Sequence, residues 1–411
     1  MMSEEFPKEW RVSKLSDLGF SYSGLKSKSK KDFDEDGNAL FVTYRNINKN
    51  YFVDKQDLAP VHVRSNENQD SVEKGDVLFT VSSETPEEVA FSSVMKDEIE
   101  NLYLNSFSFG YRFNDSNKTF PDFYAYYFRN GYFRKTVFPL AQGSTRYNIS
   151  RNELLKLEVP IPTIKEQQKI AAILSAVDKA IEKTEQIIEQ TRIVKKGLMQ
   201  QLLSKGIGHK NYKESVVGRI PESWKVLELS EVVEILDGQR KPIKKADREL
   251  IDGDIPYYGA SGIIDWVNDF IFNEPLILLA EDGENLKSRN LPIAFKIEGK
   301  SWVNNHAHVL RPTKININFL EYYLESLDYE KYISGSAQPK LNQQAIRKIK
   351  VVCPDGAEQE KISNILTNID DKIKKEKKAV EQLTKTKQGL MQQLLIGKVR
   401  VTIDENEEVP T

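Results

Sequence analysis

The sequence predicts an α+β protein in which two mixed α/β domains are separated by a long antiparallel two-helix coiled coil. Three observations predict this fold and a pseudo-twofold internal repeat. One helical pattern occurs twice, a long divergent block precedes each copy, and both blocks open with a similar motif. A repeat of this kind determines the architecture of the whole chain, so each helix and strand belongs to one copy or the other.

The opening motif of each half is Pro-x-x-Trp-x-Val. It consists of Pro7, Trp10 and Val12 in the first half and of Pro221, Trp224 and Val226 in the second. With the helical pattern, it divides the chain into four segments. These are a first domain (1–150), a first helix with a linker (151–213), a second domain (214–342), and a second helix with a C-terminal tail (343–411).

The two predicted helices, 166–203 and 358–395, are 192 residues apart and identical at 19 of 38 positions. Their apolar residues alternate in steps of 4 and 3, which is the heptad pattern of a coiled coil. A lone helix would leave this stripe in water, so the two should pack together, and the folded block between them favours an antiparallel pair. The predicted seam consists of Ile170, Leu174, Val177, Ile181, Ile188, Leu198, Leu202, Ile362, Leu366, Ile369, Ile373, Val380, Leu383, Leu390 and Leu394.

Glycine occurs at the same place in both helices, as Gly197 and Gly389. A glycine costs a helix about 1 kcal/mol relative to alanine. Its repeated use indicates either a close helix crossing or a point of fraying.

The blocks ahead of the helices share little except an aromatic, helix-like patch, at 123–128 and 319–324. Each patch precedes a Gly-Ser pair, Gly143-Ser144 and Gly335-Ser336, which suggests two equivalent loops. The apolar run 276–280 is typical of a buried strand. The two halves of the chain are similar at their ends and different in between, which predicts one scaffold that presents two different surfaces.

Together these motifs resemble the specificity subunit of type I restriction–modification systems, over essentially the whole chain. The resemblance implies two target-recognition domains, each reading one half of a split site in double-stranded DNA. The paired helices would set the gap between the half-sites and dock two modification (methyltransferase) subunits, which restriction (motor–nuclease) subunits would join. S-adenosylmethionine, ATP and Mg²⁺ would belong to these partners, and this chain would hold no cofactor.

Three near-matches to catalytic or metal motifs fail on context. Gly299-Lys300-Ser301 has Ala294 where a phosphate loop needs its first glycine, and a strand pattern follows it. The run 254–257 resembles the Asp-Pro-Pro-Tyr of adenine methyltransferases but has the wrong second residue. His306 and His308 would share a strand face without a third ligand nearby. We therefore predict no catalytic or metal site, and keep a stand-alone DNA methyltransferase or nuclease and a two-headed scaffold that does not bind DNA as alternatives.

Composition is consistent with a cytoplasmic protein. The chain has one cysteine, so it has no disulfide framework, and no apolar run approaches the roughly 18 residues of a membrane span. The N-terminus lacks the apolar core of a signal peptide. A net charge of −2 and a pI near 6.2 exclude a generally basic surface, so local clusters must carry any contact with DNA.

The candidate DNA-binding residues are polar or cationic side chains in predicted loops, which suit contacts with base edges and phosphates. We expect the segment 285–290 to be a hairpin tip, and alanine at Arg240 or Arg289 to weaken one half-site. The candidates are Arg45, Asn46, Ser82, Arg112, Ser144, Thr145, Arg146, Gln239, Arg240, Lys241, Lys244, Tyr258, Ser261, Lys287, Arg289, Asn290, Asn304, Asn305, His306, Ser336, Gln338 and Lys340.

Overall fold

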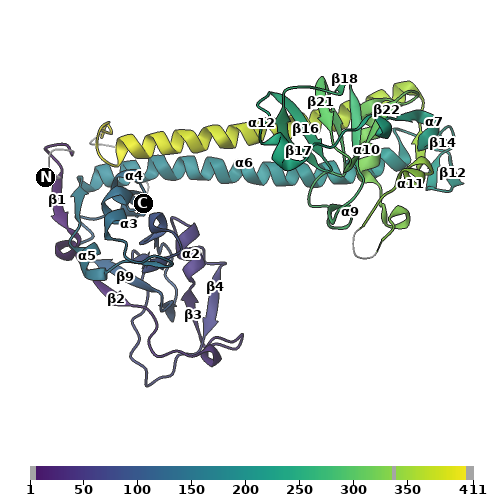
Figure 1. Ribbon diagram of the computed structural model, residues 1–411. Helices are drawn as coiled ribbons and strands as arrows, with labels where there is room; N and C mark the ends of the chain where they lie inside the picture. The colour runs from purple at the N-terminus through teal and green to yellow at the C-terminus, as the bar shows by residue number, and fades with distance from the viewer. Residues whose placement is uncertain (1–5, 336–338, 404–411) are drawn as a thin grey trace. The chain divides into compact units, whose positions relative to one another are not determined.

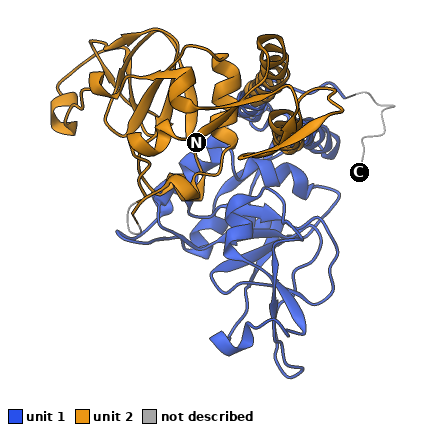
Figure 2. Ribbon diagram, turned by 90° about the vertical axis from the view of Figure 1, so that its right-hand side faces the viewer, with its two compact units in different colours: residues 1–184, 379–411 blue, residues 185–378 orange. Residues whose placement is uncertain are grey.

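The computed structural model describes residues 6–335 and 339–403. The chain divides into two compact units, Met1–Thr184 with Ala379–Thr411 and Glu185–Lys378 (Figure 2). Each unit holds one α/β domain and a part of each of two long helices, α6 (Ile164–Lys205) and α12 (Gly356–Leu394). Among the described residues, neither these nor the shorter helices are apolar enough over sufficient length to cross a bilayer. The predicted boundaries at 150, 213 and 342 stay a prediction.

The domain of the first unit is built on two small sheets. The antiparallel sheet has the order β2-β9-β5-β7, and the mixed sheet β4-β3-β8 contains one parallel pair, β3 with β8. Its strands are β1 (Arg11–Lys14), β2 (Gly19–Ser23), β3 (Ala39–Val42), β4 (Leu58–Val61), β5 (Val77–Thr80), β6 (Ser82–Ser83), β7 (Ser92–Val94), β8 (Leu102–Leu104), β9 (Ser108–Phe113), β10 (Tyr147–Asn148) and β11 (Glu158–Ile161). Its short helices are α1 (Leu15–Leu18), α2 (Tyr44–Lys49), α3 (Pro121–Tyr127), α4 (Gly131–Val137) and α5 (Arg151–Leu155).

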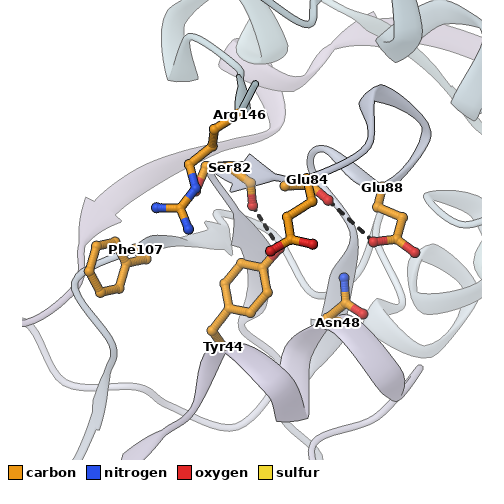
Figure 3. A pocket seen from close by; sticks show the side chains of 8 residues that line it. Tyr44, Asn48, Ser82, Glu84, Glu88, Phe107 and Arg146 are labelled. Carbon is orange, nitrogen blue, oxygen red and sulfur yellow. Dashed lines mark hydrogen bonds between the residues drawn. The ribbon is translucent and has the colours of Figure 1, made fainter. Parts of the chain in front are cut away.

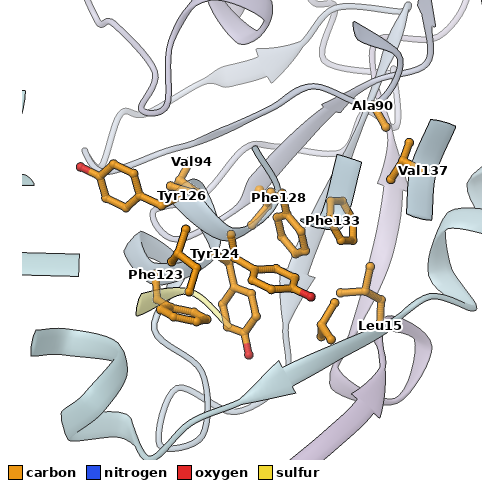
Figure 4. Packing of buried hydrophobic residues seen from close by; sticks show 14 of the residues in the cluster. Leu15, Ala90, Val94, Phe123, Tyr124, Tyr126, Phe128, Phe133 and Val137 are labelled. Carbon is orange, nitrogen blue, oxygen red and sulfur yellow. The ribbon is translucent and has the colours of Figure 1, made fainter. Parts of the chain in front are cut away.

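The core of this domain forms around the aromatic patch predicted to be helical. The patch is the helix α3, of which Phe123 to Tyr127 are all buried (Figure 4). Its rings pack against Phe128 and Phe133, and the same cluster includes Ile170 and Leu174 of α6. The helix therefore joins the sheet to the long helix through one continuous apolar core.

The domain of the second unit repeats this plan with different lengths. Its sheets have the orders β15-β22-β19-β20 and β17-β16-β21-β18, and β16 pairs in parallel with β21 as β3 does with β8. Its strands are β12 (Tyr212–Ser215), β13 (Gly218–Pro221), β14 (Lys225–Glu228), β15 (Val233–Ile235), β16 (Ile255–Gly259), β17 (Gly262–Val267), β18 (Phe272–Asn273), β19 (Leu276–Ala280), β20 (Ala294–Ile297), β21 (Lys300–Val303), β22 (Ala307–Pro312) and β23 (Lys350–Cys353). Its short helices are α7 (Leu229–Val232), α8 (Lys245–Arg248), α9 (Asn285–Ser288), α10 (Ile317–Ser326) and α11 (Gln343–Arg347). The predicted strand 276–280 is β19, buried at all five residues.

The two long helices are antiparallel within each unit (Figure 1). In the first unit Asp178 of α6 meets Lys387 of α12, and in the second Lys195 of α6 meets Asp370 of α12, both at 2.6 Å. The α6 number rises by 17 between the two pairs while the α12 number falls by 17, so the pairs fit one antiparallel register. All fifteen predicted seam residues are buried or half-buried, so the heptad prediction is confirmed.

The prediction of a close helix crossing at the shared glycines is wrong. A Cβ atom added at Gly197 or Gly389 would meet nothing within 4 Å, and both residues are exposed. Neither glycine ends its helix, because α6 continues to Lys205 and α12 to Leu394. Nothing in the packing explains their shared position.

The opening motif of each half anchors the start of a long helix. In the first unit the Trp10 indole donates to the Glu166 carboxylate at 3.3 Å, and in the second Trp224 donates to Glu358 at 2.8 Å. A short antiparallel pair of strands accompanies each contact, β1 with β11 and β14 with β23. The motif that is repeated in the sequence therefore makes the same contacts in both units.

A basic side chain completes each of these anchors from the segment that follows the other long helix. Arg400 donates to Glu166 at 2.8 Å, and the His209 imidazole lies 2.8 Å from Glu358. A glycine with positive φ precedes each of these two residues by three positions, and a Cβ there would come within 3.1 Å of the tryptophan ring. These positions need glycine because they combine a left-handed turn with close packing.

The Glu166 anchor should make the first unit sensitive to acid. Burial raises the pKa of this carboxyl, but hydrogen bonds from Arg400, Thr163 and Trp10 outweigh it and hold the pKa below its ordinary value of 4.5. The ionised carboxylate therefore adds stability above pH 4.5 that is lost as the pH falls through the lowered pKa.

We expect the excess free energy of unfolding of the wild type over Glu166→Gln to shrink between pH 6 and pH 3. Urea unfolding at each pH measures it. The control is Glu9→Gln, because Glu9 is an exposed partner of Arg400. If the excess stability of the wild type over Glu9→Gln falls by as much across this pH range as that over Glu166→Gln, the assignment is contradicted.

Candidate nucleic-acid interface

The first domain carries an open cavity of about 360 Å³ at one end of its sheets (Figure 3). Tyr44 and Phe107 give it two aromatic rings, and Arg146 gives it a guanidinium group. Asn48, Ser82, Ser83, Glu84 and Glu88 complete the lining. The Tyr44 hydroxyl donates to the Ser82 carbonyl at 2.7 Å, which fixes that ring beside β6.

Both Gly-Ser loops are closed in the same way. Gln142 and Asn148 exchange two backbone hydrogen bonds of 2.8 Å, and Ser334 and Lys340, 192 residues later, exchange two of 2.9 Å. Asn148 pairs with Ser82, and Lys340 pairs with Asp282. Ser82 and Asp282 therefore hold equivalent positions in the two domains. The sequence predicts that the two Gly-Ser loops are equivalent, but it does not predict the equivalence of the residues that pair with them.

A second equivalence joins the turns that precede β9 and β22. The Asn105 side chain accepts from the backbone N–H of Phe107 at 3.0 Å, and the Asn304 side chain accepts from that of His306 at 2.8 Å. The backbone N–H of each asparagine donates to the end of a neighbouring strand, at Val42 or Tyr258. Phe107, with 62% of its surface exposed, and the exposed His306 therefore occupy the same place on the scaffold.

The equivalent positions carry unlike side chains. Phe107 in the first domain corresponds to His306 in the second, and the Ser82 hydroxyl corresponds to the Asp282 carboxylate. A third position, Arg146, corresponds by the 192-residue offset to Gln338, which lies outside the described residues, as does Ser336. The backbone framework is shared while hydrogen-bonding groups, charge and shape differ.

The second domain gathers four of its candidates around two acidic residues. Arg240 lies 2.7 Å from Glu281 and Lys340 lies 3.3 Å from it, while His306 lies 3.0 Å from Asp282. Arg240 also donates to the Asn305 carbonyl. Burial raises the pKa of the Glu281 carboxyl, but the Arg240 hydrogen bond and nearby positive charges outweigh burial, and the pKa lies below its ordinary value.

The other candidates are distributed over both domains. Arg45, Ser144, Thr145, Gln239, Lys241, Lys244, Lys287 and Asn290 are exposed, and Tyr258 and Ser261 are half-buried. Of the first-domain candidates, only Ser82 and Arg146 line the cavity. Their contact with DNA stays a prediction.

Arg240 and Arg289, for which we predict contacts with DNA, are both held by contacts within the protein. The Arg240 side chain is 13% exposed and donates to Glu281 and to the Ala307 carbonyl, both at 2.7 Å. Arg289 donates to the Leu327 carbonyl at 2.7 Å. The segment 285–290 lies in the connection between the antiparallel strands β19 and β20, so it is at the tip of a hairpin as predicted. The tip contains the one-turn helix α9, which is followed by a left-handed residue, Arg289.

Three further candidates have structural roles. Arg112 makes a two-pronged contact with Asp76, at 2.7 and 2.8 Å, and this hydrogen bonding raises the guanidinium pKa. Asn46 is fully buried and donates to the Asp54 and Asp57 carbonyls. Asn304 is buried in the turn described above. Because the donors of Arg112 and Asn46 are already used and Asn304 is buried, these side chains suit the framework better than base edges.

Sequence reasoning missed four residues that line the first cavity, Asn48, Glu84, Glu88 and Phe107, and the second-domain position Asp282. No periodicity marks these residues, since they lie in turns or in short elements such as the six-residue helix α2. The turn sequences Asn-x-Phe at 105–107 and Asn-x-His at 304–306 were the available signal. Their offset of 199 differs from the 192 of the helices, so the alignment did not reveal them.

The rejected motifs lie in ordinary structure. The run 254–257 leads into β16, and the segment 299–301 leads into β21. His308 is buried, with Asp237 at 2.7 Å and the Leu341 carbonyl at 2.7 Å, whereas His306 is exposed outside the strand. Within residues 6–335 and 339–403, no group of three or more metal-binding side chains comes together.

Comparisons with known proteins place this architecture in a family. The model of the type I restriction modification DNA specificity domain matches twice, at residues 7–191 and 221–385. The putative type I restriction enzyme MjaX specificity subunit of Methanocaldococcus jannaschii is 27% identical, over 97% of this chain and 95% of its own. The MjaVIII specificity subunit of the same organism is 29% identical, over 71% of this chain and 73% of its own.

Solved structures show the same fold. The S subunit of a type I restriction-modification system from M. genitalium has a TM-score of 0.57 at 19% identity, covering 96% of this chain and 98% of its own. A chain from a study of complex assembly in the type I R-M system has a TM-score of 0.61 at 13% identity, covering 96% and 99%. With both halves matched by the family model, the chain belongs to the type I restriction modification DNA specificity family and carries two copies of its domain.

Proposed function

We propose that this protein is the DNA sequence-recognition subunit of a type I restriction–modification complex, without catalytic activity of its own. Each domain reads one half of a bipartite site, and the paired long helices set the gap and dock the modification subunits. Methylation and ATP-dependent cleavage, with S-adenosylmethionine, ATP and Mg²⁺, belong to partner subunits. The curated relatives, which are named specificity subunits, support this assignment.

The observation that carries the proposal is the shared framework with unlike side chains. Ser82 and Phe107 in one domain correspond to Asp282 and His306 in the other. A protein that binds two copies of one ligand needs two equal sites. Two different sites on one framework suit a target with two different halves, and base edges in the major groove differ in this way.

Methylome sequencing tests the function. Cells that carry this chain with its cognate modification subunit should methylate one bipartite DNA sequence, and cells with either protein alone should methylate none. Methyl transfer by the purified chain alone would favour the alternative of a stand-alone methyltransferase. Absence of any sequence-specific methylation with both proteins would contradict the proposal.

Arg146→Ala should weaken recognition of the first half-site only. The side chain is exposed at the cavity and, unlike Arg112, has room to reach a base edge or a phosphate. A lost two-pronged base contact costs about 1–3 kcal/mol and relaxes one position. Methylation of a library with randomised half-sites measures it.

The conservative variant Arg146→Lys separates the two kinds of contact. Lysine retains a phosphate contact but not a two-pronged contact with guanine. If Arg146 reads a base, lysine should relax the sequence as alanine does. Unchanged selectivity at both half-sites in the alanine variant would remove Arg146 from the interface.

A further inference from the structure

In the first unit, three groups from three different segments meet at one carboxylate. The Tyr126 hydroxyl of α3 donates to one oxygen of Asp178 in α6 at 2.8 Å. The Lys387 ammonium of α12 lies 2.6 Å from the other oxygen. Each carboxylate oxygen therefore has its own partner, and the cluster joins the domain to both long helices.

The second unit repeats this cluster with the roles of the long helices exchanged. Tyr322 of α10 donates to Asp370 of α12 at 2.7 Å, and Lys195 of α6 lies 2.6 Å from the same carboxylate. The aspartates and the lysines are each 192 residues apart, and the tyrosines are 196 apart. Two domains that differ elsewhere keep the same three groups in the same arrangement. We call each set a Tyr–Asp–Lys cluster.

The cluster of the first unit is the more strongly desolvated. The Lys387 side chain is 10% exposed and lies 3.7 Å from the centre of the Tyr51 ring, whereas Lys195 is 23% exposed. Burial lowers the pKa of Lys387, although Asp178 opposes this, and burial with Asp178 raises the pKa of Tyr126. Removing one partner of a buried charge pair is strongly unfavourable because the other charge is left uncompensated.

Each domain is also held at the start of a long helix. The Gln167 side chain accepts from the backbone N–H of Phe120 at 2.7 Å, and Gln359 accepts from that of Asn316 at 2.7 Å. In both units the aspartate of the cluster follows this glutamine by 11 residues, about 17 Å along the helix. A body held at two separated points cannot pivot about either one. Of these two points, the cluster is the one farther from the start of the long helix.

We propose that the two Tyr–Asp–Lys clusters fix the angle at which each domain stands on the long helices, and so make the protein select a single gap length. The inference rests on the proposed function, because a gap exists only if both domains read DNA. The six residues act through the domains they position. They are positioning residues for DNA recognition: the two tyrosines contact the long helices, the other four residues belong to those helices, and none of the six lines the cavity of the first domain.

The test measures methylation over a library in which both half-sites are kept and the gap is lengthened or shortened by one or two base pairs. Cells carry the chain, or a variant, with the cognate modification subunit. For Asp178→Asn we expect the same half-sites, but a preference for the native gap over its neighbours reduced about tenfold, the change that 1.4 kcal/mol gives. Asp370→Asn should have a smaller effect because its cluster is less buried. The control is Asp371→Asn, an exposed neighbour that should leave the gap preference unchanged.

Lost stability alone lowers methylation at every gap equally, so the ratio between gaps separates positioning from folding. If Asp178→Asn does not fold, Tyr126→Phe removes one hydroxyl from the same cluster and gives the same test. A gap preference as strict as that of the wild type in folded Asp178→Asn, or in Tyr126→Phe if the former fails, overturns the inference and leaves the proposed function intact. If the wild type itself methylates no bipartite site, the proposed function fails and the inference falls with it.

Discussion

Removal of seven paired residues from each long helix is expected to shorten the preferred gap by about three base pairs. Deleting residues 183–189 from α6 and 376–382 from α12 removes segments that face each other in the antiparallel register set by the Asp178–Lys387 and Lys195–Asp370 pairs. One heptad is about 10 Å of helix, and DNA rises ~3.4 Å per base pair. The seam stays in phase because the deletion equals its period.

The measurement is methylation over a library of gap lengths, with both half-sites unchanged. A five-residue deletion from each helix is the matched control, because it rotates the remaining parts of each seam by about 140° relative to one another and should lower methylation at every gap. If the seven-residue deletion restores activity at no shorter gap while the protein remains folded, the helices do not set the gap.

Trp224→Ala is expected to destabilise the second unit by about 3–5 kcal/mol, the usual cost of emptying a buried aromatic site. Trp224 is fully buried, and its indole donates to Glu358 beside His209. The variant therefore loses packing and leaves one oxygen of the Glu358 carboxylate without its donor, which adds to the cost, while His209 stays at the other oxygen. Recognition of the second half-site should fall with it.

Native-state hydrogen exchange measures this loss, because it resolves the two units where a single unfolding curve does not. The matched control is Trp266→Ala in the same unit, where the ring is 49% exposed and the change should stay within about 0.5 kcal/mol. Equal protection factors in the two variants would show that Trp224 does not anchor the start of α12.

Particular residues show why some predictions held. The heptad residues from Ile170 to Leu202 recur at a fixed spacing, and burial of such a stripe depends only on finding a similar stripe, which the same chain supplies 192 residues later. Likewise Leu276 to Ala280 are apolar throughout and form a buried strand. Local period and internal repetition were sufficient in both cases.

Arg240 and Phe107 show why the candidate interface was predicted only in part. Arg240 stands in a loop typical of a DNA contact, yet its partner Glu281 is 41 residues away. Phe107 is an aromatic residue that sequence reasoning would place in a core, and a turn held by Asn105 turns it outward. Such partners are set by the meeting of distant strands, which no local pattern records.

The sequence alone determined the duplicated plan, the two long helices, their antiparallel pairing and the relation to specificity subunits. These follow from periodicity and repetition, which are properties of the chain read in order. Only the tertiary structure decided which polar side chains are used internally, which positions of the two domains correspond, and where Tyr126 and Tyr322 meet the long helices. The physical reason is that hydrogen bonds and ion pairs act over about 3 Å, so each depends on which distant segments the fold brings together.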